Sequence, residues 1–474
     1  MKLWLGLGIV IALSLVMLAC AGASSGSSSN DSSSGSSGSG GSGSSPTPVT
    51  VPPGTLSEQY FGLHIDMGAL KNKYPWPSFP FGSIRMTSTG TRWSDIDQGN
   101  GVYDFTTLDQ WLALYVQHGA TNPAGNYQII YTIYSVPNYI SSNPTDLCYY
   151  SSNPDSGHPA GSCDPPTDLN ADGTGTNQTY KNFITAIANH AAGNGPGQIH
   201  YWELWNEPNN TTLWNGTLAQ LVRMAGDARS IILSIDSSAQ FLTPSPVTTG
   251  NPNPAFTTPD GWMSAYLAAG GGQYADIIGF HGYVEPGKPV EGVFGITQGM
   301  SNLATTSNVA SKPIWDTEIG FGTAYVTDPY MQAAWLARAY LMQPGLGIQR
   351  VFWFQYGATN VGTLLNTAET ASNPAGSAYG VLYNWLLGAK ATGPCTTSGT
   401  VWTCGYTLLS GAQAQAVWDS SQTCSLSGAS EICTTSSFTA DSTYTKYQDL
   451  QGVSHNISSG SVEIGAEPIL LESQ

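Results

Sequence analysis

Two glutamates follow long apolar runs in distant parts of the chain. The run 199–205 closes on Asn-Glu-Pro, which places a carboxyl group at Glu207, and the run that begins at Pro313 leads to Glu318. An apolar, aromatic run of this kind is typical of a buried strand that delivers its last residues to the rim of a barrel. Two carboxyl groups at one rim can share the acid and base work that cleavage of a glycosidic bond requires.

That chemistry sets different demands on the two groups. One must hold its proton to protonate a leaving oxygen, whereas the other must be ionised to act at the anomeric carbon. Asn206, just before Glu207, is suited to bind a sugar 2-hydroxyl. Alternation along the strand predicts Asp316 on the same side as Glu318, as the second candidate for the nucleophile, but its place one step deeper favours a buried orienting group. Glu203 lies deeper than Glu207 in the same way.

The elements that must position these groups alternate between strands and helices from about residue 56 to residue 390. The predicted strands are 60–65, 82–86, 128–134, 199–205, 240–243, 276–281, 313–318 and 349–354. Helical patterns between them include 183–192, 218–233, 331–341 and 378–387. Eight such alternations predict an α/β protein with a (β/α)8 TIM barrel, assigned to residues 47–390.

The chain changes character after Lys390. Helix formers become scarce, and short Thr-, Ser-, Val- and Tyr-rich runs separated by glycines take their place. This pattern predicts a small β-sandwich accessory domain over residues 391–474, with a first strand supplied from residues 47–58.

The N-terminus is typical of an exported protein. Residues 1–20 contain one basic residue, an apolar core and small residues before Cys20, and they resemble a bacterial lipoprotein signal peptide. Lipidation would then fall on Cys20, although Met17 departs from the usual box and leaves ordinary signal cleavage as the alternative. Residues 21–46 are almost entirely Ser and Gly, which predicts a disordered linker.

Cysteine spacing fits an oxidising compartment. Six of the seven cysteines remain once Cys20 is set aside, and they fall into three sequence-local pairs. The predicted disulfides are Cys148–Cys163, Cys395–Cys404 and Cys424–Cys433. We expect a secreted or outer-surface protein that meets the membrane only through its lipid anchor.

Composition narrows the class of partner. The 14 Lys and Arg against 31 Asp and Glu give a net charge of −17, which argues against nucleic acid and anionic membranes. Only 9% of the residues are charged, whereas Trp, Tyr, Asn, Ser and Thr are abundant. Such a surface suits a neutral carbohydrate, and we expect a monomer without a cofactor.

Several of these motifs together resemble clan A retaining glycoside hydrolases across the whole barrel. The matching positions are Arg85, Trp205–Pro208, His281–Tyr283, Glu318 and Trp353. The stretches 61–65, 76–85, 89–93 and 103–109 are most similar to glycoside hydrolase family 39 and its relatives.

The resemblance implies a role for each matching residue. Glu207 would be the acid/base and Glu318 the nucleophile, with Arg85 and Tyr283 keeping Glu318 ionised and oriented. Trp353 would form an aromatic floor under the sugar. The implied substrate contacts are Asn206, Arg85, His64, His281, Tyr283 and Trp353.

A long insertion after the third predicted strand carries further candidates. Its tyrosines suit stacking on sugars; they are Tyr134, Tyr139, Tyr149 and Tyr150. Asp168, Asn170 and Asp172 copy the first half of a calcium loop, but Thr179 stands where the twelfth, acidic ligand is expected. A structural calcium is therefore one hypothesis and a purely structural loop the other.

The favoured function is a retaining β-glycosidase that hydrolyses a polysaccharide or oligosaccharide by double displacement, acting within chains. Two alternatives stay open. One is a non-catalytic carbohydrate-binding surface lipoprotein, and the other is a transglycosylase on the same fold.

Overall fold

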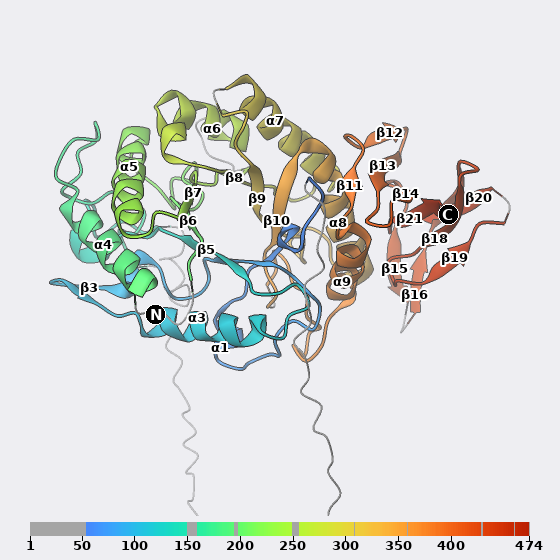
Figure 1. The fold of residues 1–474 in the computed structure, drawn as a ribbon, viewed down its shortest axis with the longest axis horizontal. Helices are drawn as coiled ribbons and strands as arrows, with labels where there is room; N and C mark the ends of the chain where they lie inside the picture. The colour runs from blue at the N-terminus through green and yellow to red at the C-terminus, as the bar shows by residue number, and fades with distance from the viewer. Residues whose placement is uncertain are drawn as a thin grey trace, which may run out of the picture. The chain divides into compact units, whose positions relative to one another are not determined.

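The computed structural model describes residues 54–148, 159–193, 198–248, 256–307, 309–357, 359–427, 430–458 and 460–473 (Figure 1). The predicted signal peptide, Cys20 and the linker 21–46 lie outside these residues, as do Tyr149 and Tyr150. In the described part of the chain, no helix has both the length and the apolar character to cross a membrane.

Eight parallel strands form a barrel, as the sequence predicts. They are β1 (Phe61–Leu63), β2 (Ser83–Met86), β5 (Gln128–Thr132), β6 (Tyr201–Glu203), β7 (Gln240–Leu242), β8 (Ile278–His281), β9 (Ile314–Ile319) and β10 (Ile348–Trp353). The strands follow the order β7-β6-β5-β2-β1-β10-β9-β8. A parallel bridge between Leu242 and Ile277 joins the two ends and closes the barrel.

Helices surround the strands (Figure 1). The α-helices are α1 (Met67–Leu70), α2 (Trp93–Ile96), α3 (Thr106–Gly119), α4 (Gln178–Gly193), α5 (Leu218–Ile235), α6 (Pro259–Ala268), α7 (Gly292–Thr306), α8 (Pro329–Met342) and α9 (Pro374–Leu386). Short 3-10 helices are η1 (Glu58–Tyr60), η2 (Asn138–Ile140), η5 (Gly271–Tyr274) and η6 (Pro344–Leu346). Side-chain caps begin several of them: Thr217 and Gln220 cap α5 reciprocally, and Asp328 caps α8.

The base of the barrel is filled by apolar and aromatic side chains. Trp315, Phe352 and Ile130 belong to one interior cluster with Leu242 and Ile277. The guanidinium of Arg350 lies 3.9 Å over the ring of Trp315 and 4.7 Å over that of Tyr201. Because packed side chains close this end, the polar chemistry is left to the carboxyl-end rim.

Antiparallel sheets follow the barrel and confirm the predicted sandwich. One sheet contains β11 (Lys390–Ala391), β12 (Thr396–Ser398), β13 (Val401–Thr407), β14 (Gln413–Asp419), β18 (Tyr444–Gln448), β19 (Ser454–Asn456) and β21 (Ile469–Ser473). The pair β17 (Thr435–Thr439) and β20 (Ser461–Gly465) contributes Val462 and Ile464 to a small core shared with Val417 and Leu471 of that sheet. The remaining hairpins are β15 (Cys424–Ser427) with β16 (Ser430–Cys433) and β3 (Asp97–Gly99) with β4 (Val102–Tyr103).

The expected first strand is not formed where the structure describes it. Residues 54–57 form a turn and an irregular segment, and Glu58–Tyr60 is a 3-10 helix. Leu56 instead exchanges backbone hydrogen bonds with Gly388 and Ala389, which ties the start of the described chain to the end of the barrel. Residues 47–53 of the prediction lie outside the described ranges.

A buried ion pair joins the barrel to the C-terminal sheets. Arg338 of α8 is 2% exposed, pairs with Glu291 at 2.9 Å and donates to the carbonyl of Ala466. Trp418 of β14 donates to the same Glu291 carboxylate. The predicted disulfides, Cys148–Cys163, Cys395–Cys404 and Cys424–Cys433, are present.

Candidate active site

Glu207 stands four residues beyond the end of β6, and its backbone turns toward the barrel mouth. Its φ is +44°, and its N–H donates to the carbonyl of Ser245 at 2.9 Å. Its carboxyl group lies 2.9 Å from Nδ1 of His281, and its side chain is only 16% exposed. Burial raises the pKa of Glu207 to about 7, against a smaller lowering by Arg85. Such a carboxyl group holds its proton near neutral pH.

A β-bulge in β9 aims the second glutamate. Asp316 pairs with Phe280 and Glu318 pairs with His281, so Thr317 is an extra residue between the two pairs. A bulge changes the alternation of side chains along a strand and commonly redirects one beside an active site. Glu318 consequently reaches the barrel mouth.

The expectation that Asp316 shares the side of Glu318 is wrong, because regular alternation stops at the bulge. Asp316 is fully buried and accepts from the Gln343 side chain at the end of α8 and from the Gly282 N–H, each at 2.9 Å. It therefore supports the helix layer and the end of β8 and does not enter the site.

Glu318 is held by two donors from other strands. Arg85 Nη1 donates to its Oε2 at 2.8 Å, and the Tyr283 hydroxyl donates to its Oε1 at 3.1 Å. Burial raises the pKa of Glu318 above its usual range, while His281, Arg85 and the Tyr283 hydrogen bond lower it. The sequence suggested only the lowering by Arg85, because burial could not be read from it. Glu318 thus has a cationic partner in direct contact, whereas Glu207 has none.

The two carboxyl groups face each other at short range. One carboxylate oxygen of Glu207, one ring nitrogen of His281 and one carboxylate oxygen of Glu318 all lie within 4.8 Å of one another. One carboxylate oxygen of each glutamate is thus within 4.8 Å of the other. A reacting carbon placed between them would be reached by both.

Arg85 at the end of β2 connects the two halves of the site. It is fully buried and donates to Glu203 at 2.7 Å, to Glu318 at 2.8 Å and to Oδ1 of Asn206 at 2.8 Å. The last bond fixes the orientation of the Asn206 amide, since its oxygen faces Arg85 and its NH2 group is left to donate elsewhere.

His281 is a neutral imidazole in this setting. It is fully buried, and burial lowers its pKa to about 4, with Glu318 acting in the opposite direction. At neutral pH the contact between His281 and Glu207 is therefore a hydrogen bond and not an ion pair.

His64 is placed differently from its expected role. Its Nε2 lies 2.9 Å from the carbonyl of Thr317, which can only accept, so Nδ1 accepts from the Thr87 hydroxyl at 2.9 Å. The ring is 1% exposed, and burial keeps its pKa well below the usual value. With both nitrogens engaged, His64 holds the bulge residue in place and offers a sugar no polar group.

The aromatic side chain at the mouth of β10 is Phe354 and not Trp353. Trp353 is fully buried and packs edge-on against Phe321, which in turn contacts Trp335 of α8. Phe354 is half-buried, and its ring lies 5.2 Å from that of His64. Alternation decides this, because Phe352 belongs to the interior cluster and Trp353 must point the opposite way. The resemblance to clan A enzymes had assigned this role to Trp353.

The insertion after β5 presents one of its described tyrosines to solvent. Tyr134 is buried and donates to the carbonyl of Thr87, whereas Tyr139 is 56% exposed and donates to Asp97 at 3.0 Å. Tyr139 therefore has a free ring face on this side of the barrel.

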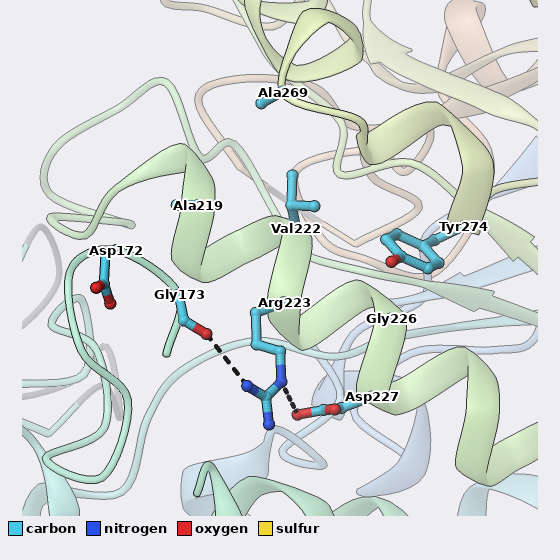
Figure 2. A pocket seen from close by; sticks show the side chains of 9 residues that line it. All are labelled: Asp172, Gly173, Ala219, Val222, Arg223, Gly226, Asp227, Ala269 and Tyr274. Carbon is cyan, nitrogen blue, oxygen red and sulfur yellow. Dashed lines mark hydrogen bonds and ion pairs between the residues drawn. The ribbon is translucent and has the colours of Figure 1, made fainter. Parts of the chain in front are cut away.

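The calcium-like segment makes local hydrogen bonds. Asp168 accepts from the N–H of Thr179 at the start of α4, and Asp172 accepts from the N–H and hydroxyl of Thr174. Figure 2 shows the surface depression beside it, where Arg223 of α5 donates to the Gly173 carbonyl and pairs with Asp227. These contacts attach the loop to α5, and the depression contains no pair of opposed carboxyl groups.

The sequence prediction discounted Glu203 and missed other residues that surround the candidate site. Glu203 is fully buried against Arg85, and Ser245 donates to Glu203 while accepting from Thr317. The spacing of Glu203 four residues before Glu207 was a usable signal, since Glu203 ends β6 and Glu207 follows that strand. Nothing in the local sequence marks Ser245, Thr317 or Phe354.

Several solved structures that share this fold are described as glycoside hydrolases. A family 39 glycoside hydrolase from Bacteroides cellulosilyticus is 16% identical, with 90% of this chain and 83% of that chain covered and a TM-score of 0.58. A monomeric beta-xylosidase from Caulobacter crescentus is 14% identical, with 89% and 97% covered and a TM-score of 0.55. The catalytic domain of a family 30 xylanase C from Talaromyces cellulolyticus is 16% identical, with 89% and 98% covered and a TM-score of 0.51.

At these identities the likeness establishes a common fold, which confirms the resemblance at that level. No family model matches the chain, and no curated protein matches its sequence.

Proposed function

We propose that the protein is a retaining β-glycosidase in which Glu207 is the acid/base and Glu318 the nucleophile. The observation that carries the proposal is that one oxygen of the Glu207 carboxyl group lies within 4.8 Å of one oxygen of the Glu318 carboxyl group, and that only Glu318 contacts a cation. Retaining enzymes place their two carboxyl groups about 5–5.5 Å apart, whereas inverting enzymes need about 6.5–9.5 Å to admit a water between them. The structural neighbours, two of them named as a β-xylosidase and a xylanase, support the same reaction class.

The reaction proceeds in two displacements. The Glu318 carboxylate attacks the anomeric carbon and forms a glycosyl ester while the glycosidic C–O bond breaks. Glu207 gives its proton to the departing oxygen. In the second step Glu207 removes a proton from water, the water oxygen attacks the anomeric carbon, and the ester bond breaks to release Glu318 and the sugar. The configuration at the anomeric carbon is retained.

The surrounding residues serve these steps. Arg85 and Tyr283 donate to Glu318 and keep its attacking oxygen directed at the sugar. Asn206, with its oxygen bound to Arg85, presents its NH2 group to the 2-hydroxyl, a contact that strengthens as positive charge develops in the ring. Phe354 offers an apolar face beneath the sugar.

The proposal also assigns a substrate, a domain organisation and a location to the protein. The substrate is a neutral β-linked polysaccharide, cut within the chain, and Tyr139 extends the binding surface beyond the cleaved bond. The chain comprises a catalytic barrel over 47–390 and an accessory sandwich over 391–474. It acts as a monomer outside the cell, anchored through Cys20. The net charge of −17 and the exposed aromatic ring support this choice of substrate.

A hydrolysis screen tests the reaction class. The purified protein is offered β-xylan, β-glucan, β-mannan and the corresponding 4-nitrophenyl β-glycosides, with Glu318→Gln and the exposed Glu285→Gln as matched variants. We expect one sugar series to be cleaved, with activity lost at least about a thousandfold in Glu318→Gln and kept in Glu285→Gln. Proton NMR should show the β-anomer as first product.

Three other outcomes would overturn the proposal. Glycan binding without turnover would favour a carbohydrate-binding protein, and an α-anomer as first product would exclude retention. Predominant transfer to a sugar acceptor at low acceptor concentration would favour a transglycosylase.

A further inference from the structure

One buried glutamate has no part in the two displacements. Glu203, the last residue of β6, is fully buried and lies four residues before Glu207. Its Oε2 accepts from Arg85 Nε at 2.7 Å and lies 2.6 Å from Arg85 Nη2. Two nitrogens of the guanidinium thus contact one oxygen of Glu203, while the third nitrogen contacts Glu318.

Two hydroxyl groups also donate to the carboxylate of Glu203. The Thr132 hydroxyl donates to Oε2 at 2.6 Å, and the Ser245 hydroxyl donates to Oε1. A fully buried carboxylate is stable as an anion only with a cation and hydrogen-bond donors of this kind, so Glu203 carries a fixed negative charge beneath the site.

A chain of hydrogen bonds leads from Glu203 to the bulge beside Glu318. Thr317 donates to the Ser245 hydroxyl at 2.8 Å, and its carbonyl accepts from His64 at 2.9 Å. The cation that contacts Glu318 and the backbone that aims it are therefore both connected to Glu203.

We propose that Glu203 is a positioning residue: a permanent buried counterion that fixes Arg85 between two carboxylates and thereby sets the geometry and the charge felt by the catalytic pair. This inference rests on the proposed function. One guanidinium shared by two carboxylates leaves the site with one net negative charge, which acts on Glu207 as well as on Glu318. Without that charge, Glu318 alone would balance Arg85, and the net negative charge that acts on Glu207 would be lost.

The charged and titratable groups that face Glu207 come from four strands and their ends. They are Arg85 from β2, Glu203 from β6, His281 and Tyr283 from the end of β8, and Glu318 from β9. Of these, Glu203 raises the pKa of Glu207 and Arg85 lowers it. Removal of the Glu203 charge should therefore let Glu207 lose its proton at lower pH.

The test substitutes Glu203→Gln in the full chain, which keeps the shape and removes the charge. Two readouts are followed: kcat and KM on the 4-nitrophenyl β-glycoside that the unsubstituted protein cleaves, and the titration of carboxyl groups by infrared difference spectroscopy, with the Glu207 band assigned by its loss in Glu207→Gln. We expect kcat to fall about 10- to 100-fold with KM within about threefold, because Glu203 does not touch the substrate. The Glu207 titration should move down by about one pH unit.

A matched control is another largely covered glutamate paired with an arginine. Glu291→Gln breaks the pair with Arg338 and the contact with Trp418 of the C-terminal sheet, so it should lower the melting temperature and leave kcat and the Glu207 titration unchanged. If Glu203→Gln does not fold, Thr132→Val removes one donor to Glu203 and should still lower kcat about threefold.

The proposal is overturned if Glu203→Gln keeps both kcat and the Glu207 titration, if Glu291→Gln shifts them equally, or if Thr132→Val is tested and leaves kcat unchanged. The infrared titration needs no turnover. An inactive protein would contradict the proposed glycosidase, whereas an unmoved carboxyl titration would contradict the role of Glu203, so the two failures are distinguishable.

Discussion

Two buried arginines of the barrel strands, Arg85 of β2 and Arg350 of β10, lie at opposite ends of the barrel, and their surroundings are opposite in kind. Arg85 at the rim lies between the carboxylates of Glu203 and Glu318. Arg350 at the base lies against the rings of Trp315 and Tyr201 and donates to neutral groups. Burial lowers the pKa of Arg350 to about 10, whereas the two carboxylates raise that of Arg85.

The difference teaches how one barrel separates stability from chemistry. At the base, the cation is covered by aromatic faces and serves packing. At the rim, charges of both signs are buried together, which is costly and is seen where a site must control ionisation. Substitutions at the rim should therefore change rates, and substitutions at the base should change stability.

The largest effect expected from this comparison, after loss of the nucleophile, comes from the acid. Glu207→Ala should lower kcat on unactivated β-linked oligosaccharides about 10²- to 10⁴-fold, because the leaving oxygen then departs without a proton. The loss on 4-nitrophenyl glycosides should be much smaller, since nitrophenolate needs no acid. Equal losses on both substrates would contradict the acid role of Glu207.

Proton loss from the same group should set the upper pH limit. Glu207 has a pKa of about 7 and must be protonated to act, so kcat/KM on an unactivated substrate should fall above pH 7 by about tenfold per pH unit. The sign follows from burial, which favours the protonated carboxyl group. The measured pH profile of Glu207→Ala should no longer show this fall of kcat/KM above pH 7. A fall that persists in the variant would mean that another group causes it.

Substitution of the two aromatic side chains at the end of β10 should have a smaller effect on activity. Phe354→Ala should raise KM or lower kcat/KM about tenfold by removing the apolar face at the barrel mouth. Trp353→Phe should change kcat/KM less than threefold and lower the melting temperature, because Trp353 packs against Phe321 away from the site. The reverse pattern would restore the tryptophan as the sugar platform.

The smallest effect on rate is expected at the base. Arg350→Met should leave kcat within about twofold, because the nearest rim groups belong to a different layer of the barrel. The free energy of unfolding should change by about 1–3 kcal/mol, measured by urea denaturation. A large loss of kcat without loss of stability would break the proposed division between base and rim.

The sequence alone determined the barrel and singled out the two candidate carboxyl groups. All eight predicted strands occur within a few residues of their expected bounds, because long apolar runs and their alternation with helices are local signals. Glu207 and Glu318 were found because each ends such a run. The three disulfides followed from sequence-local pairing.

Only the tertiary structure decided which side each side chain takes and what surrounds it. A single extra residue, Thr317, moves Glu318 into the site and leaves Asp316 outside it. The register of β10 likewise places Phe354 and not Trp353 beside His64. The contact between His64 and the carbonyl of Thr317, on a distant strand, makes His64 a residue that holds the β9 backbone. Burial and pairing across strands depend on residues more than a hundred positions apart, such as Arg85 and Glu203, so local patterns carry no record of them.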